Sequence, residues 1–201
     1  MMSRENMDSL RIELSVKCKN GINFLLAAAI IWSGIGFIWT LDETAVQKSY
    51  LTFYIGMLML PLAFLFSRLF NTVWNVKNNP LNPLGLQLNL AQLFYFPFLF
   101  FFLSKTPEYF VMAYAIITGA HFFPYSWFYK TNLFVFGAGV ISVGSWLIAE
   151  LLPGKIAYVP FFTSIILVIL TGLLTLDFLK KKKTWEQVYA KQQEHDLLSL
   201  S

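Results

Sequence analysis

The feature that most constrains this chain is a series of six long windows without a charged residue. The windows that lack Asp, Glu, Lys and Arg are residues 20–41, 49–67, 78–104, 109–129, 131–149 and 156–176. A membrane-spanning helix needs roughly 20 consecutive apolar residues to cross a hydrocarbon core of about 30 Å. Six such windows in succession predict an all-α, polytopic integral membrane protein.

Composition agrees with that prediction. Of the 201 residues, 57% are hydrophobic and only 13% are charged, whereas an ordinary soluble domain carries about 25% charged residues. The segment 78–83 is rich in Asn and Pro and predicts a loop, so the third helix is expected to start near Gln87. The six predicted spans are then residues 21–40, 49–70, 87–104, 108–129, 131–151 and 157–178.

The positions of Lys and Arg predict the orientation, because both residues are enriched in cytoplasmic loops. With the N-terminus inside, the cytoplasmic side holds 12 basic residues, namely Arg4, Arg11, Lys17, Lys19, Arg68, Lys77, Lys130, Lys180, Lys181, Lys182, Lys183 and Lys191. The outer side holds three, which are Lys48, Lys105 and Lys155. The sequence therefore predicts that both termini are cytoplasmic.

Three regions follow from this topology: residues 1–20, a transmembrane domain over 21–179, and a basic tail over 180–201. In the first region Met7, Leu10 and Leu14 share one helical face, which is typical of a short amphipathic helix on a membrane surface. The tail is expected to form a short cytoplasmic helix over 184–198.

The basic run at the start of the tail consists of Lys180, Lys181, Lys182 and Lys183. A basic run is a possible footprint for nucleic acid. This run directly follows a predicted span, where Lys residues ordinarily set topology and contact anionic headgroups. Lipid is therefore the expected partner, and nucleic acid is not.

The sequence offers little catalytic chemistry. It contains no HExxH, GxSxG, CxxC, GxxxxGK[ST] or GxGxxG motif. With two His and one Cys in the chain, a metal centre or a haem site is hard to assemble, so neither a metal nor a cofactor is expected. These observations argue against an enzyme without excluding one.

A layer of polar residues is the remaining candidate for a site, if each helical residue advances by about 1.5 Å. Several residues then fall between roughly 8 and 18 Å from the inner end of their spans. The candidate ligand-binding residues are His121, Gln92, Ser33, Trp32, Ser142 and Thr171. The same layer contains Pro61 and Pro97, and Pro124 lies nearby; such prolines free backbone carbonyls and kink helices.

Each of these residues also has a purely structural interpretation. Ser, Thr and Gln can hydrogen-bond between helices, and a buried Trp can simply pack. His121 is the sharpest candidate, because ionisable groups inside a span are costly and often functional, but a hydrogen bond to Gln92 or Thr171 would also account for it. Glu150 and Asp177 lie near span ends and are candidates for a gate or a counter-ion.

One short element carries a family resemblance. The stretch Gly119-Ala120-His121-Phe122-Phe123-Pro124, together with Pro61-Leu62-Ala63 and six spans, resembles a bacterial family labelled domain of unknown function 7010. The resemblance covers most of the chain and implies a bacterial plasma membrane. It implies no activity and no catalytic residue.

Three functions remain open from the sequence. The first is a protein that binds or moves a small apolar or weakly polar molecule through a cavity near His121. The second is a structural or interaction subunit that docks a partner through its cytoplasmic termini, and the third is an intramembrane enzyme acting on lipid. A homo-oligomer is compatible with all three.

Overall fold

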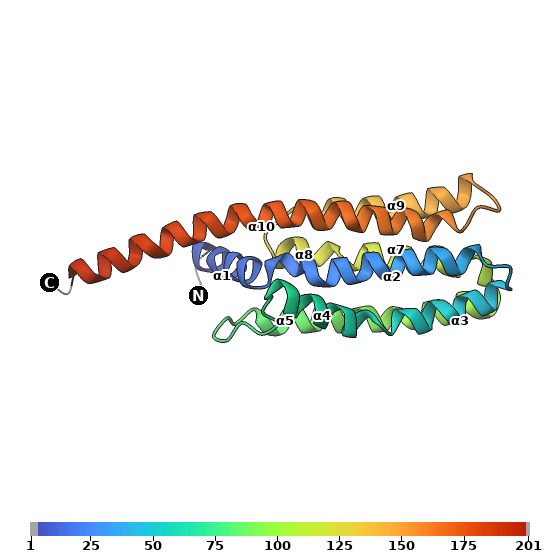
Figure 1. Cartoon of the computed structure of the whole chain (residues 1–201), viewed down its shortest axis with the longest axis horizontal. Helices are drawn as coiled ribbons and strands as arrows, with labels where there is room; N and C mark the ends of the chain where they lie inside the picture. Colours follow the sequence, from blue (N-terminus) through green and yellow to red (C-terminus); the bar gives the residue numbers. More distant parts are fainter. Residues whose placement is uncertain (1–3, 200–201) are drawn as a thin grey trace.

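The computed structural model describes the backbone of residues 4–199 and the side chains of residues 6–187. Within that part of the chain every regular element is helical (Figure 1), so the predicted all-α class is confirmed. Five helical stretches are long and apolar enough to cross a membrane, namely Lys19–Thr40, Ala45–Phe70, Asn82–Lys105, Leu133–Leu151 and Tyr158–Gln187. The remaining predicted span, 108–129, is also helical but is broken.

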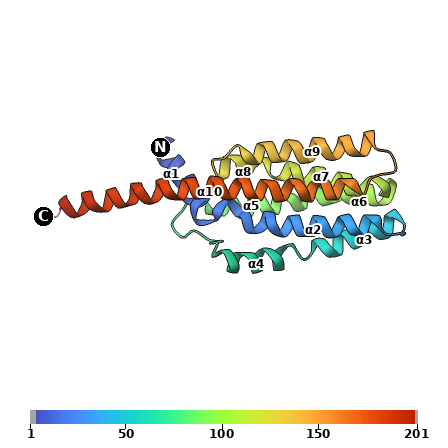
Figure 2. The ribbon, with the colours of Figure 1, turned by 45° about the horizontal axis from the view of Figure 1, so that its top comes forward.

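We call each of these six helical stretches a column. Three of the columns break beside a proline. The second column consists of α3 (Ala45–Gly56) and α4 (Met59–Phe70), and the third consists of α5 (Asn82–Ala91), the 3-10 turn η2 (Gln92–Tyr95) and α6 (Phe96–Lys105). Figure 2 shows these segments following one another end to end.

The fourth column consists of the turn η3 (Pro107–Tyr109), α7 (Phe110–His121) and α8 (Phe123–Phe128). Pro61, Pro97 and Pro124 each lie in the first turn of the segment after a break. Proline lacks an N–H and its ring clashes with the carbonyl four residues earlier, so it is tolerated there and not in a helix interior. The helices are therefore interrupted beside each of these prolines, where kinks were predicted.

The third column begins earlier than expected, at Asn82 and not near Gln87. The Asn79 side chain accepts a hydrogen bond from the Leu81 N–H at 3.0 Å, and the Asn82 side chain accepts one from the Val76 N–H at 2.9 Å. Pro83 lies in the first turn of α5, where no N–H is needed. The Asn and Pro residues that predicted a loop therefore also start the helix.

The last column differs most from its prediction. Helix α10 runs without a break from Tyr158 to Ser199, so the tail continues the last apolar helix and is not a separate short helix. No Gly or Pro occurs after Gly172 to interrupt it. The C-terminal part of α10 projects beyond the rest of the protein (Figure 1). The side chains after Gln187 lie outside the described residues.

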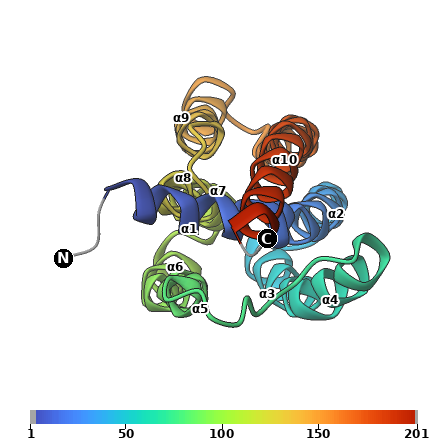
Figure 3. The ribbon, with the colours of Figure 1, turned by 90° about the vertical axis from the view of Figure 1, so that its left-hand side faces the viewer.

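The chain starts with α1 (Arg4–Lys17) and the turn η1 (Lys19–Gly21), followed by α2 (Ile22–Thr40). Viewed from the end that carries both termini, α1 crosses the columns (Figure 3). Leu14 on the predicted apolar face is fully buried, and Met7 and Leu10 are half-buried. Part of this face therefore packs on the protein, and α1 as a whole packs against α10.

The packing around these columns is uneven. Helix α2 packs against α10, α3 and α4, while α9 (Leu133–Leu151) packs against α7, α8 and α10. The core is formed mainly by apolar residues of α2, α7, α9 and α10, such as Ile35, Phe110, Phe134 and Leu167. In contrast, Leu99 is the one buried residue recorded in α6, and α5 contains none.

Candidate functional site

The predicted polar layer does not gather around one cavity. Ser33 in α2 shares a hydrogen bond of 2.7 Å with Ser164 in α10, and the Ser164 hydroxyl donates to the Ala29 carbonyl at 2.8 Å. Ser142 in α9 donates to the Ile116 carbonyl of α7 at 3.2 Å. These hydroxyls hold pairs of helices together, which is the structural interpretation of the layer.

Thr171 and Gln92 are likewise separate from His121. The Thr171 hydroxyl donates to the Leu167 carbonyl of its own helix at 2.7 Å. Gln92 starts the η2 turn and is half-buried. The sequence suggested a hydrogen bond from His121 to one of these two side chains. Neither bond occurs in the described part of the chain.

Trp32 is buried in the core, with only 3% of its surface exposed. Its ring packs against Tyr114 of α7 at a centroid distance of 5.2 Å. It therefore joins α2 to α7, and its indole is surrounded by protein.

His121 ends α7, directly before the break at Phe122. It is half-buried, and its ring meets the Tyr125 ring edge-on at a centroid distance of 5.3 Å. Within the described part of the chain it has no recorded hydrogen-bond partner. The histidine is thus an imidazole among aromatic rings, at the end of one helical segment.

Tyr125 beside it was not selected from the sequence. The residue is 8% exposed, and its hydroxyl is buried without a hydrogen-bond partner in the described structure. Its ring stacks on Tyr129 and packs against Phe128 and Phe134. The spacing of four residues from His121 to Tyr125 was the available signal, since it places both on one face if the helix continues.

The two acidic candidates have different environments. Glu150 lies exposed in the last turn of α9. Asp177 belongs to a network, because one of its carboxylate oxygens accepts hydrogen bonds from Asn20 at 2.8 Å and from Lys181 at 2.7 Å. Lys181 also donates to the Tyr129 carbonyl at 2.9 Å.

Asn20 is the centre of this network and was also missed. It is fully buried, accepts a hydrogen bond from Ser15 at 2.6 Å, and donates to the Leu174 carbonyl at 3.0 Å. Its backbone is left-handed, as are those of Lys19 and Gly21 on either side. Asn tolerates this conformation better than most residues, so the turn can direct its amide toward α10.

The neighbouring Cys18 is a structural thiol. It is partly buried, and burial raises its pKa to about 12, so the thiol stays protonated at neutral pH.

The other three residues of the basic run 180–183 have simpler surroundings. Lys182 lies 3.6 Å from Glu186, and Lys180 and Lys183 are exposed. Among the described residues, no group of three or more His, Cys, Asp and Glu side chains could hold a metal ion.

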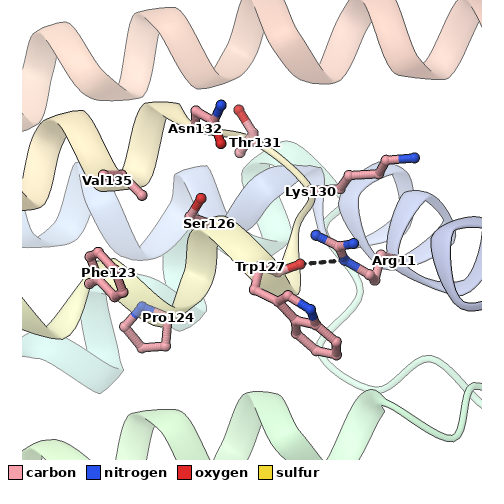
Figure 4. Close-up of a pocket in the computed structure, with 9 residues that line it drawn as sticks. All are labelled: Arg11, Phe123, Pro124, Ser126, Trp127, Lys130, Thr131, Asn132 and Val135. Carbon is pink, nitrogen blue, oxygen red and sulfur yellow. Dashed lines mark hydrogen bonds between the residues drawn. The ribbon is translucent and has the colours of Figure 1, made fainter.

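A recess lies at the end of the molecule that carries the termini. Its volume is about 500 Å³, and α1, α8, the following loop and the start of α9 form its walls. Figure 4 shows Arg11 and Lys130 at one end, and Phe123, Pro124 and Val135 toward the other, with Trp127 and Ser126 between them. We call this feature the α1–α8 recess; Thr131 and Asn132 complete its lining.

Ion pairs organise the charged end of the α1–α8 recess. Asp8 of α1 pairs with Arg11 at 2.8 Å and with Lys130 at 2.9 Å, using a different oxygen for each. The hydrogen bond from Lys130 lowers the pKa of the Asp8 carboxyl, and the charge of Arg11 acts in the same direction. Arg11 Nε also donates to the Trp127 carbonyl at 2.5 Å, so α1 is attached to α8.

Comparison with known proteins agrees with the resemblance seen in the sequence. No curated protein and no solved structure matches the chain. One family model matches residues 7–177, which include most of α1, all of η1 and the helical columns up to α9, and α10 as far as Asp177. On this match, the chain belongs to the family of unknown function DUF7010.

Proposed function

We propose that this protein is a six-span membrane protein of the bacterial plasma membrane, with both termini in the cytoplasm. The five apolar helices support this topology, and so does the course of α7 and α8 along α9. The excess of Lys and Arg at the end that carries the termini supports the orientation. A fluorescent-protein fusion to the C-terminus tests it, since green fluorescent protein exported unfolded to the outer side would stay dark.

Within this bundle, the break between α7 and α8 is the proposed site for a small molecule. The observation that carries this proposal is the Tyr125 hydroxyl, which is buried without a hydrogen-bond partner beside the half-buried His121. Leaving a polar group unpaired in a buried position costs roughly 1–3 kcal/mol. A ligand with one hydrogen-bonding group and an apolar body would remove that cost.

A pair of variants tests this site. If a ligand occupies it, Tyr125→Phe and His121→Ala lower the amount of small molecule that copurifies with the protein, measured by mass spectrometry after extraction. The matched control is Tyr109→Phe, because Tyr109 is 45% exposed. A Tyr125→Phe protein that is more stable than wild type and retains the same extract would refute the site, since only an unused hydroxyl would then have been removed.

Movement of the molecule across the membrane is a further part of this proposal. Three columns are broken beside prolines, and broken helices often occur where transporters bind their substrates. Vesicles that contain the purified protein should release the copurified molecule faster than empty vesicles. Equal release from both would limit the function to binding.

Docking of a partner is the second candidate function. Helix α10 continues far beyond the last apolar residues and projects from the bundle (Figure 1), which leaves a long helical surface for a partner. Removal of residues 184–201 should abolish capture of a specific membrane or cytoplasmic partner. The third candidate, an intramembrane lipid-modifying enzyme, has the least support from the geometry. His121 is next to aromatic rings and not to a second catalytic group.

A further inference from the structure

The α1–α8 recess combines two cations with apolar walls. Arg11 and Lys130 come from parts of the chain more than a hundred residues apart, and Asp8 holds both of them at one rim. Together the three side chains carry a net charge of one positive unit. The other wall is apolar and open to the surroundings, with Phe123 62% exposed and Val135 40% exposed.

The two cations keep hydrogen-bond donors that the protein does not use. Arg11 donates through Nε to the Trp127 carbonyl and through Nη1 to Asp8, and Nη2 has no partner among the described residues. The Lys130 ammonium group has three N–H donors, of which Asp8 accepts one. Such unused, charge-assisted donors suit a phosphate oxygen.

The position of the recess selects the source of that phosphate. The recess is lined by residues of α1 and α8, and α1 crosses the ends of the apolar columns (Figure 3). Trp127 is 46% exposed, and the centroid of its ring lies 4.9 Å from the guanidinium carbon of Arg11. Exposed Trp beside basic residues is typical of the headgroup level of a membrane. A free phosphate ion would bind the cations but would make no contact with the apolar wall formed by Phe123, Pro124 and Val135.

We propose that the α1–α8 recess binds an anionic phospholipid of the leaflet on the side of the termini. The phosphate contacts Arg11 and Lys130, and one acyl chain lies along Phe123 and Val135. Asp8 holds the two cations apart at a fixed spacing and reduces their mutual repulsion. This site requires that the columns lie in a membrane but is independent of the ligand proposed beside His121.

A fluorescence titration of the full-length protein in a neutral detergent tests the proposal. The probe is phosphatidylglycerol with brominated acyl chains, which quench a tryptophan that they contact. Because the protein has six Trp residues, the signal of Trp127 is the difference between the wild-type and the Trp127→Phe protein. This difference should show saturable quenching. Brominated phosphatidylcholine and sodium phosphate are the comparison ligands, because the first has no net charge and the second has no acyl chain.

Variants then locate the site. Lys130→Gln should weaken phosphatidylglycerol binding roughly fivefold, as expected for one basic residue near an anionic lipid. Val135→Trp should abolish binding by filling the recess while keeping every charge. Lys182→Gln is the matched control, because Lys182 is on the same side of the protein and makes only an ion pair within α10. The affinity of the Lys182→Gln protein for phosphatidylglycerol should stay unchanged.

Three results would overturn the proposal. Equal quenching by phosphatidylcholine would mean that the bilayer lipid simply surrounds the protein. Equal weakening by Lys182→Gln would assign binding to the basic end as a whole. Competition by millimolar sodium phosphate as strong as that by phosphatidylglycerol would indicate a site for free anions.

Discussion

The pair α2 and α10 differs sharply from the column formed by α5 and α6. In the apolar window of Lys19–Thr40, 61% of the residues are buried inside the protein, whereas the value for Asn82–Lys105 is 6%. The first pair is joined by Ser33, Ser164 and the Asn20 network, while Phe94 and Phe98 of the second column are largely exposed. Contacts within the protein therefore hold one part of the bundle, and the other part depends on the proposed lipid environment.

The largest expected effect is at Asn20. Asn20→Ala removes three hydrogen bonds, two of them buried and one partly buried, and leaves Ala in a left-handed backbone. We expect a loss of about 3 kcal/mol in the free energy of unfolding, measured by titration with sodium dodecyl sulfate in mixed micelles. Asn89→Ala is the control in the exposed column, since Asn89 bonds only to the Gly85 carbonyl of its own helix. Equal losses for the two variants would contradict the comparison.

A smaller effect is expected at Gly36. A Cβ atom there would lie 2.6 Å from the Phe161 ring of α10, so Gly36→Ala should cost about 1–2 kcal/mol by overpacking. Gly172 of α10 has no atom within 4 Å of such a Cβ. Gly172→Ala should therefore stabilise the protein by about 0.5–1 kcal/mol, the ordinary preference for Ala in a helix. The opposite signs are measurable in the same unfolding titration, and a common sign would refute the close contact.

Ser164→Ala should have a modest effect. It removes the hydrogen bonds to Ser33 and to the Ala29 carbonyl, and hydrogen bonds between membrane helices are worth about 0.6 kcal/mol on average. We expect a loss of about 0.5–1 kcal/mol in the same assay. Ser104→Ala in α6 removes only a bond to the Phe101 carbonyl of its own helix and should be close to neutral.

The smallest predicted effect concerns pH. The pKa of Asp8 lies below its ordinary value of 3.8, so its pairs with Arg11 and Lys130 stabilise the attachment of α1 above that value and are lost as pH falls through the lowered pKa. Fluorescence of Trp127 should therefore change below pH of about 4. The Asp8→Asn protein should show no such transition. Residues 82–105 contain no Asp or Glu, so α5 and α6 should not respond.

Much of the helical plan could be predicted from local chemistry. Residues 21–40 and 131–151 were predicted as spans, and the structure has helices over Lys19–Thr40 and Leu133–Leu151. Apolar length and terminating charges are local properties, so the agreement is close. The uninterrupted α10 was not predicted, although the lack of Gly and Pro after Gly172 permits it.

The candidate site was less predictable, because depth along a helix does not specify direction around it. Ser33, Ser142 and Thr171 were expected at one depth, yet each faces a different neighbour or its own helix. Tyr125 was missed because a tyrosine in a span is ordinary until packing leaves its hydroxyl without a partner. Asn20 was missed because it seemed to be one polar residue at the start of an apolar window.

The sequence by itself determined that this chain forms a series of apolar helices with basic ends, because hydrophobicity and charge are carried by each residue wherever it lies. Only the tertiary structure decided that Asn20 contacts Asp177, 157 residues later, and that Asp8 pairs with both Arg11 and Lys130 at one recess. These contacts depend on how helices turn and pack against one another. Packing is a property of the whole set of side chains, and no single segment of the sequence specifies it.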